Sequence, residues 1–216
     1  MTGERVVRRL AAILAADVVG YSRLMGRDES GTLARLREHR KQRFEPILAR
    51  HSGRLVKLTG DGALVEFSSA VDALSAAIEF QQAMAEANRD RPEDSRIVFR
   101  VGLHLGDLIV DGDDLYGDGV NVAARLEAEA PPGGIVISRN VHDVTAGRLK
   151  ATFDDMGSLA LKNIERPVQA FGDGRRPTGR SQRRRQQCPL PLRRPSPPRR
   201  WHFPTSRRSL YCRFRT

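Results

Sequence analysis

Residues 97–105, IVFRVGLHL, place apolar side chains at every second position, and the positions between them include Arg100, Gly102 and His104. Successive side chains of a β-strand point to opposite faces of a sheet, so this period of two predicts a strand with one face in a core. A second layer has to cover that face, which limits the chain to a small set of layered folds.

Further segments predict the neighbouring strands. Residues 54–67, RLVKLTGDGALVEF, join two apolar runs around Asp61-Gly62, and Asp-Gly in such a position is a strong hairpin signal. Residues 10–19 form a nearly continuous apolar run of strand length, typical of a strand covered on both faces. Short strands are also predicted at 108–110 and at 135–138.

Three segments predict helices. Apolar residues are spaced for one helical face over 22–50, and residues 68–88 are Ala-rich and amphipathic. The segment 113–127, DDLYGDGVNVAARLE, begins in a Gly-rich loop at 111–117 and then predicts a helix. The resulting order is β, α, β-hairpin, α, β-hairpin, α, β. It favours an α+β fold, a split βαβ (ferredoxin-like) arrangement in which helices pack on one face of an antiparallel-rich sheet.

The basic character of the chain resides in its C-terminal segment. The net charge is +11, but residues 172–216 hold 14 arginines, no lysine and one acidic residue, which leaves residues 1–171 slightly acidic. This segment has no apolar periodicity and is rich in proline, so we predict a domain at 1–171 and a disordered tail at 172–216. The tail fits a frame-shifted reading of a GC-rich message, a native Arg/Pro-rich linker or a segment for an anionic partner. Nucleic acid is expected to bind only non-specifically, through the tail.

Cysteine usage and hydropathy indicate the compartment. Cys188 and Cys212 both lie in the tail, so neither a disulfide framework nor a Cys-based metal site can hold the domain together. The run LAAILAA after three arginines resembles a short signal peptide, but it continues directly into the predicted first strand. No stretch approaches the length of a transmembrane helix. We therefore expect a cytoplasmic protein without a membrane span.

Two aspartates are candidate metal ligands. Asp17 lies where an apolar strand ends, and it either caps the following helix or binds a cation. Asp61 lies in the hairpin turn, where an aspartate also occurs simply because it tolerates turn geometry. If the first strand lies beside the hairpin, the two carboxylates are neighbours and need a cation between them. Oxygen ligands without nearby His or Cys favour Mg²⁺ or Mn²⁺.

Asn121 and Arg125 lie four residues apart on the predicted helix and therefore on the same side of it. The pair is either a solvent-facing stripe or a pair of groups aimed at one target. Lys57 and Asp114 are unremarkable alone, and His104 is more typical of a structural residue. The sequence contains no G-x-x-x-x-G-K-[ST] loop and no G-x-S-x-G motif, which excludes a P-loop site and this type of acyl chemistry.

Five motifs in order resemble the class III adenylate/guanylate cyclase catalytic domain over about residues 8–171. They are AADVVGYSRLM, KLTGDGALVEF, VGLHLGDLIV, DDLYGDGVNVAARLE and LKNIERPVQAF. The resemblance implies the class III nucleotidyl cyclase fold. It also implies that Asp17 and Asp61 bind two divalent metal ions, Mg²⁺ or Mn²⁺, and that Lys57 and Asp114 recognise adenine.

The same resemblance implies that Asn121 orients the ribose and that Arg125 stabilises the transition state. Metal-binding residues then come from one subunit and the other four residues from its partner, so a homodimer is expected to be required for activity. The implied activity is that of an adenylate cyclase that converts ATP into 3′,5′-cyclic AMP and pyrophosphate. The alternatives are an inactive nucleotide-binding or dimerisation module, and a protein that binds nucleic acid through its tail.

Overall fold

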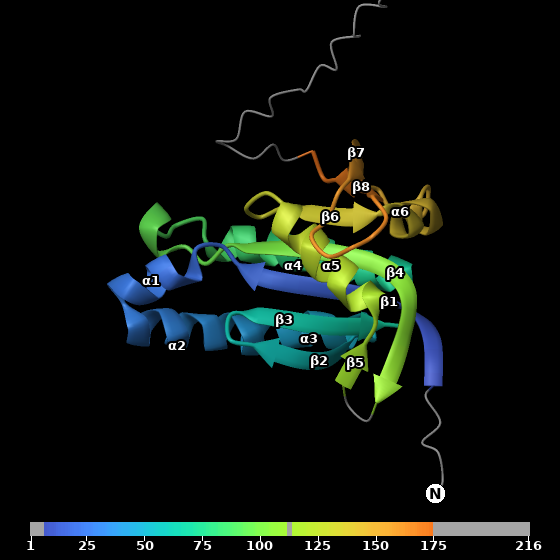
Figure 1. Cartoon of the computed structure of the whole chain (residues 1–216). Helices are drawn as coiled ribbons and strands as arrows, with labels where there is room; N and C mark the ends of the chain where they lie inside the picture. The colour runs from blue at the N-terminus through green and yellow to red at the C-terminus, as the bar shows by residue number, and fades with distance from the viewer. Residues whose placement is uncertain (1–6, 112–113, 175–216) are drawn as a thin grey trace, which may run out of the picture. The chain divides into compact units, whose positions relative to one another are not determined.

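The computed structural model describes residues 7–111 and 114–174, which form one sheet with packed helices (Figure 1). The strands are β1 (Val7–Val18), β2 (Arg54–Thr59), β3 (Gly62–Phe67), β4 (Phe99–Asp111), β5 (Asp114–Tyr116), β6 (Ile135–Ser138), β7 (Asp154–Leu159) and β8 (Val168–Gly172). The α-helices are α1 (Tyr21–Arg27), α2 (Glu29–His39), α3 (Glu45–Arg50), α4 (Ala70–Ala87), α5 (Asp118–Glu129) and α6 (Arg139–Thr145). A π-helix, η1 (Arg40–Phe44), joins α2 to α3, and a 3₁₀ turn, η2 (Glu93–Ser95), precedes β4.

The sheet is mixed but mostly antiparallel. Its strand order is β2-β3-β1-β4-β6-β8-β7, and β5 pairs with the end of β4. Neighbouring strands are antiparallel except β4 and β6, which are parallel and connected through α5. The predicted α+β fold with an antiparallel-rich sheet is therefore confirmed.

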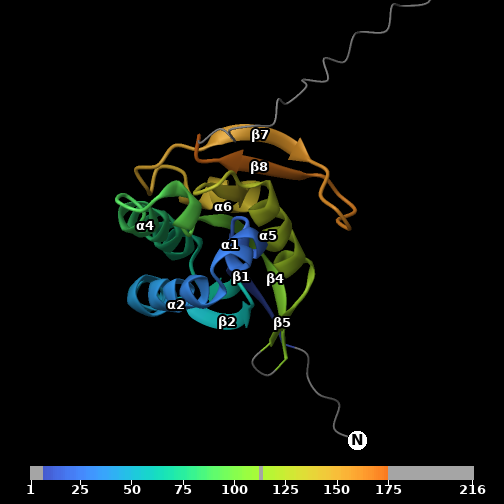
Figure 2. The same ribbon diagram turned by 90° about the vertical axis from the view of Figure 1, so that its left-hand side faces the viewer.

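Helices cover both faces of the sheet, so the expectation of helices on one face is wrong. Ala12, Leu14 and Ala16 of β1 belong to the core under α2, α3 and α4. Ala11 and Ile13 point to the other face, where they pack with α5. Figure 2 shows α4 and α5 on opposite sides of the strands. The apolar run of β1 leaves no polar face for water, so each face needs a covering layer.

The predicted helix over 22–50 is interrupted twice. The side chain of Asp28 accepts a hydrogen bond from Gly31 N at 2.9 Å, and this N-cap begins α2 immediately after α1 ends. The π-helix at 40–44 then shifts the helical phase before α3. Asp28 was the available sequence signal for the first break, whereas apolar spacing alone does not reveal a π-helix.

The strand pattern is more extended than predicted. The strands expected at 97–105 and 108–110 form one strand, β4. They are continuous because β1 extends back to Val7 and pairs with β4 from Phe99 to Val110. The predicted hairpin is confirmed, but its two-residue turn is Gly60-Asp61, and Gly60 has the positive φ of 61°. Part of the expected loop 111–117 is the short strand β5, and β7, β8 and α6 were not predicted.

Helix α5 lies directly on β4 because Gly102 has no side chain. A Cβ at Gly102 would lie 2.2 Å from Glu127 N and 2.3 Å from Ala123 O, closer than non-bonded atoms approach. The absence of a side chain at Gly102 thus allows the backbone of α5 to pack directly against β4, and this close contact sets the distance between the helix and the sheet.

The described chain ends shortly after β8. Asp173 N donates to Ile135 O at 3.2 Å, so ordered contacts continue to the end of this strand. The predicted tail lies outside the described residues from 175 on, and its disorder stays a prediction. No helix in residues 7–111 and 114–174 is both long enough and apolar enough to cross a membrane.

Candidate active site

Asp17 and Asp61 lie side by side, as the sequence predicted for a metal-binding pair. Asp17 is next to the last residue of β1, and Asp61 is the second residue of the β2–β3 turn. Asp61 is close enough to raise the pKa of the Asp17 carboxyl. A Cβ at Gly62 would lie 3.4 Å from Asp17 Oδ1, which shows how closely the hairpin approaches the end of β1.

The environment of Asp17 disfavours its charged form. Burial raises the pKa of the Asp17 carboxyl, and the neighbouring Asp61 raises it further, while Arg100 and the backbone N–H of Val18 act in the opposite direction. Asp17 does not cap the next helix, because the N-cap of α1 is Gly20. Two adjacent carboxylates with this electrostatic penalty are relieved when a cation binds them.

Arg100 and Glu127 complete the charged cluster and were not predicted as site residues. Arg100 Nη2 lies 3.7 Å from Asp17 Oδ2, and Arg100 Nε lies 3.0 Å from Glu127 Oε1. The pKa of Glu127 is raised to about 7, first by burial and then by Asp17 and Asp61, against the lowering effect of Arg100. With one guanidinium among three carboxyl groups, the cluster keeps an excess of negative charge when the acids are ionised.

A sequence signal for Glu127 and Arg100 was present. Glu127 lies on the same side of α5 as Val122, Ala123 and Leu126, all of which are buried. An acidic residue on the apolar face of a helix needs a charged partner, because an unpaired buried carboxylate is costly. Arg100, on the polar side of the alternating segment 97–105, is the basic residue of β4 that faces it.

The donor set fits a metal site that is completed by substrate. Residues 7–111 and 114–174 contain no group of three or more His, Cys, Asp or Glu arranged to hold a metal ion. Mg²⁺ is commonly bound through one or two carboxylates, with water and substrate phosphates as the remaining ligands. Asp17 and Asp61 match that pattern, so the residues present fit a divalent cation bound together with a phosphorylated ligand.

Asn121 and Arg125 lie on the opposite side of α5 from Glu127. Asn121 is exposed and Arg125 is half-buried, with its Nε donating to Lys162 O at 3.2 Å. Among the described residues, no hydrogen bond or ion pair joins either of them to Asp17 or Asp61. Within one chain they form a surface stripe, and the structure does not bring them to the aspartate pair.

Lys57 and Asp114 lie on strands that touch. Lys57 is exposed on β2, directly after an irregularity in its pairing with β3, and Asp114 begins β5. Contacts between β2 and β5 bring these two backbone positions into one region. The side chain of Asp114 lies outside the described part, so pairing of Lys57 and Asp114 on a purine ring stays a prediction.

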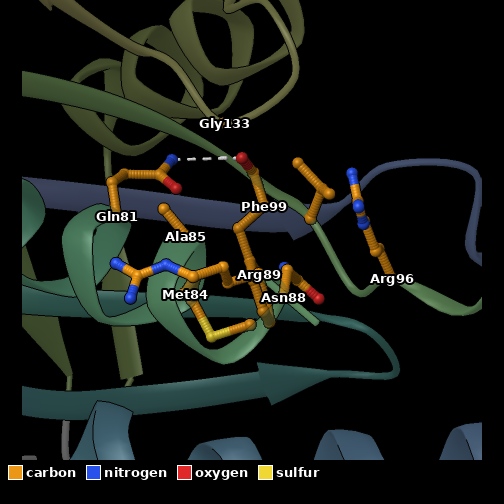
Figure 3. A pocket seen from close by; sticks show the side chains of 9 residues that line it. Gln81, Met84, Ala85, Asn88, Arg89, Arg96, Phe99 and Gly133 are labelled. Atoms are coloured by element: carbon orange, nitrogen blue, oxygen red, sulfur yellow. Dashed lines mark hydrogen bonds between the residues drawn. The ribbon is translucent and has the colours of Figure 1, made fainter. Parts of the chain in front are cut away.

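A pocket of about 330 Å³ lies elsewhere, between the end of α4 and the start of β4 (Figure 3). Gln81 Nε2 donates to Phe99 O at 3.1 Å and to Gly134 O at 3.0 Å, and Asn88 Nδ2 donates to Ile97 O at 2.8 Å. These amides tie α4 to backbone carbonyls at the start of β4 and just before β6. The residues that line this pocket do not include Asp17, Asp61, Arg100 or Glu127, so the pocket is separate from the charged cluster.

Comparison with known proteins agrees with this geometry. Residues 8–172 match the adenylate and guanylate cyclase catalytic domain. A Rhizobium meliloti (strain 1021) protein named "Putative adenylate cyclase 3" is 58% identical over 171 residues, which are 79% of this chain and 29% of that relative. A Streptomyces coelicolor adenylate cyclase is 33% identical over 134 residues, which are 62% of this chain and 34% of that relative. The chain thus spans about a third or less of these curated relatives.

Solved structures show the same fold. An adenylate/guanylate cyclase/hydrolase from Silicibacter pomeroyi is 45% identical, with a TM-score of 0.74 over 78% of this chain and 98% of that one. An adenylyl cyclase from P. aeruginosa shares the fold at 24% identity, with a TM-score of 0.68 over 82% of this chain and all of that one. The matched sequence, the shared fold and the paired aspartates lead to one conclusion: this chain belongs to the adenylate and guanylate cyclase catalytic domain family.

Proposed function

We propose that this chain is an adenylate cyclase domain that converts ATP into 3′,5′-cyclic AMP and pyrophosphate, with two divalent cations, as a homodimer. The observation that carries the proposal is the close approach of the β2–β3 turn, which carries Asp61, to Asp17 at the end of β1, where the repulsion between two carboxylates favours a cation. The name of the Rhizobium meliloti relative supports ATP as the nucleotide.

In the proposed reaction the ribose 3′-oxygen attacks the α-phosphorus of the same ATP molecule. The bond from that phosphorus to its bridging oxygen breaks, pyrophosphate leaves with the bonding electrons, and the hydroxyl proton passes to solvent. Asp17 and Asp61 would hold Mg²⁺ or Mn²⁺, which supplies charge neutralisation at the phosphates and a lower pKa for the attacking hydroxyl.

The other predicted residues act on the nucleotide itself. Arg125 offers charge-assisted donors to the phosphoryl oxygens, where negative charge grows in the transition state. Asn121, one helical turn away, holds the ribose so that its 3′-oxygen is aligned for attack. Lys57 donates to a ring nitrogen of adenine, and Asp114 accepts from the exocyclic amino group.

Two copies of the chain are needed for this assignment. Among the described residues, no hydrogen bond or ion pair joins Asn121 or Arg125 to the aspartate pair of their own chain, and an ATP held by both groups would lie between two chains. Because each chain carries every predicted residue, a two-fold symmetric dimer would form two equivalent sites. A monomer is then expected to be inactive.

The test is an assay of cyclic AMP formation by the full chain with ATP and either Mn²⁺ or Mg²⁺. The native chain should form cyclic AMP, and Asp61→Asn should lose about a hundredfold or more, since metal ions supply several kcal/mol of transition-state stabilisation. Asp72→Asn, a change of the same type in the first turn of α4, is the control and should keep full activity. A native chain that binds ATP but forms no cyclic AMP would support the inactive module instead.

A further inference from the structure

Arg40 contacts the turn that carries Asp61. It is the first residue of the π-helix between α2 and α3. One guanidinium nitrogen, Nη2, donates to Gly60 O at 2.6 Å and lies 3.5 Å from Gly62 O. These two carbonyl oxygens belong to the residues on either side of Asp61, so a single side chain holds both ends of the short segment that presents the carboxylate.

The contact is to the backbone and leaves the carboxylate available. Among the described residues, no ion pair joins Arg40 to Asp61, although the positive charge is close enough for Asp61 to influence it. Burial lowers the pKa of the Arg40 guanidinium, while Tyr21 and Asp61 raise it, and arginine remains charged under ordinary conditions. Arg40 therefore does not occupy the carboxylate oxygens of Asp61.

The turn needs such support. Its first residue, Gly60, is exposed, has a φ of 61°, and would meet nothing within 4 Å of an added Cβ. The segment therefore has no packing of its own at that point. Repulsion between Asp61 and Asp17 also favours movement of the turn away from β1. Strand pairing holds the base of the turn, at Thr59 with Gly62 and at Ala63 with Ala16, and Arg40 adds a contact at its tip.

The helix that supplies Arg40 is well anchored. Leu36 and Phe44, four residues to either side, are 1% and 4% exposed, and the Phe44 ring packs against Phe80 with centroids 4.8 Å apart. The π-helix begins at Arg40 itself, and π-helical turns often occur at functional positions because they re-aim a side chain. Arg40 thus extends from a fixed support to a turn that has little packing.

From this arrangement we propose that Arg40 is a positioning residue that holds the Gly60–Gly62 turn, so that Asp61 and Asp17 can bind one divalent cation together. The inference rests on the proposed cyclase function. Arg40 does not touch the reacting nucleotide in this account. It acts through Asp61, and its loss should weaken metal binding before it affects any other step.

The test measures Mn²⁺ binding to the full chain in the presence of 3′-deoxy-ATP, which cannot cyclise because it lacks the attacking hydroxyl. Free Mn²⁺ can be followed by electron paramagnetic resonance. Arg40→Gln should weaken Mn²⁺ binding about 10- to 100-fold, the usual range for residues that orient a metal ligand. Lys41→Gln, which removes an exposed charge from the next position, should leave it unchanged.

Cyclic AMP formation supplies the second readout. The Arg40→Gln variant should recover much of its activity at raised Mn²⁺, because the ligands remain and only their placement is weakened. Arg40→Lys keeps the charge but not the planar fork, so its activity should lie between that of Arg40→Gln and that of the native chain.

If the native chain is active and Arg40→Gln binds Mn²⁺ as tightly as the native chain does, the proposed role of Arg40 is overturned and the proposed cyclase function is not. Loss of the thermal unfolding transition in both Arg40 variants also overturns it, because Arg40 would then support the whole fold. A native chain without cyclase activity overturns the proposed function instead.

Discussion

Glu127 shows how one residue connects the helix that carries Asn121 and Arg125 to the aspartate pair. It lies on the buried side of α5, and Arg100 bridges it to Asp17. A buried carboxyl group beside other acids binds a proton more tightly than in an unfolded chain. This property makes Glu127 a measurable reporter of the charged cluster.

The first prediction concerns stability and pH. The pKa of Glu127 rises from an ordinary value of 4.5 to about 7 in the folded chain. The folded state therefore binds more protons than the unfolded state between these values, so the contribution of Glu127 to stability is full below about 4.5 and is lost as the pH rises through about 7. Each pKa unit corresponds to about 1.4 kcal/mol. Glutamine cannot titrate, so the unfolding free energy of the native chain should fall relative to Glu127→Gln from pH 4.5 to 8.

Urea unfolding in EDTA at fixed protein concentration measures this difference. Asp17, Asp61 and Arg100, the charged groups that act on Glu127, are present in both proteins, so the comparison isolates the loss of the Glu127 carboxyl. The raised pKa would be contradicted if the difference in unfolding free energy between the native chain and Glu127→Gln stayed constant with pH. It would also be contradicted if that difference changed in favour of the native chain at high pH.

The second prediction concerns the choice of nucleotide. Lys57 and Asp114 match the donor and acceptor pattern of adenine, whereas guanine presents a carbonyl where Asp114 offers no proton. The native chain should therefore have a higher kcat/KM for ATP than for GTP. Lys57→Glu combined with Asp114→Cys should shift the preference toward GTP. Equal kcat/KM for both nucleotides in the native chain would refute the assignment of these two residues.

Residue types in the site were easier to predict than their partners. The proximity of Asp17 and Asp61 was predictable because one ends an apolar strand and the other joins two, where a carboxylate needs a reason to be present. Arg40 gave no comparable signal, since an arginine on an amphipathic helix is usually a solvated residue. Its role depends on a helix and a hairpin that meet only in the folded chain. Contacts of this kind between distant segments cannot be read from local spacing.

Among the elements, the close packing of α5 on β4 determines where Asn121, Arg125 and Glu127 lie. The backbone of α5 reaches within van der Waals distance of Gly102, and neighbouring side chains of α5 fill the core beneath it. The same close packing of α5 on β4 holds both sides of the helix: the exposed stripe with Asn121 and Arg125, and the buried Glu127. A shift of α5 would disturb both sides of the helix together.

The third prediction tests this close packing. Gly102→Ala would place a Cβ 2.2 Å from Glu127 N, so α5 has to move and the chain should lose about 1–3 kcal/mol of stability, together with activity. Gly26→Ala is the matched control, because Gly26 lies in α1 with nothing within 4 Å of an added Cβ. Alanine is the better helix former, so the control should be neutral or slightly stabilised. Thermal unfolding of both variants measures the difference, and equal melting temperatures would argue against close packing of α5 on β4.

The elements differ in how far the sequence predicts them. The β2–β3 hairpin, α4 and α5 follow from local turn and periodicity signals and occur close to their predicted places. Strand β4 runs through a predicted break because pairing with β1 stabilises its second half. Strand β7, DDMGSL, has little apolar alternation and depends on its partner β8. Local patterns thus predict elements whose turn and periodicity signals lie within their own segment, and pairing between distant segments decides the rest.

In the whole molecule, the proposed active site is built from two chains. Asp17 and Asp61 lie close together within one chain, whereas Asn121 and Arg125 lie on the side of α5 opposite the buried Glu127 and form no hydrogen bond or ion pair with the aspartates among the described residues. A symmetric dimer resolves this separation, because the stripe of one copy can face the aspartates of the other. Activity should then depend on protein concentration in the same way as dimerisation does.

The most direct test mixes two inactive variants, Asp61→Ala and Arg125→Ala, and measures cyclic AMP formation. Each homodimer should be nearly inactive, one without a metal ligand and the other without transition-state charge. In a mixed dimer, one site collects both defects and the other collects neither. If subunits exchange at random, about half the dimers are mixed and each has one intact site, so activity should return to roughly a quarter of the native level. If both variants form stable, exchanging dimers and the mixture stays as inactive as its components, Asp61 and Arg125 do not serve one site across two chains, and the account is contradicted.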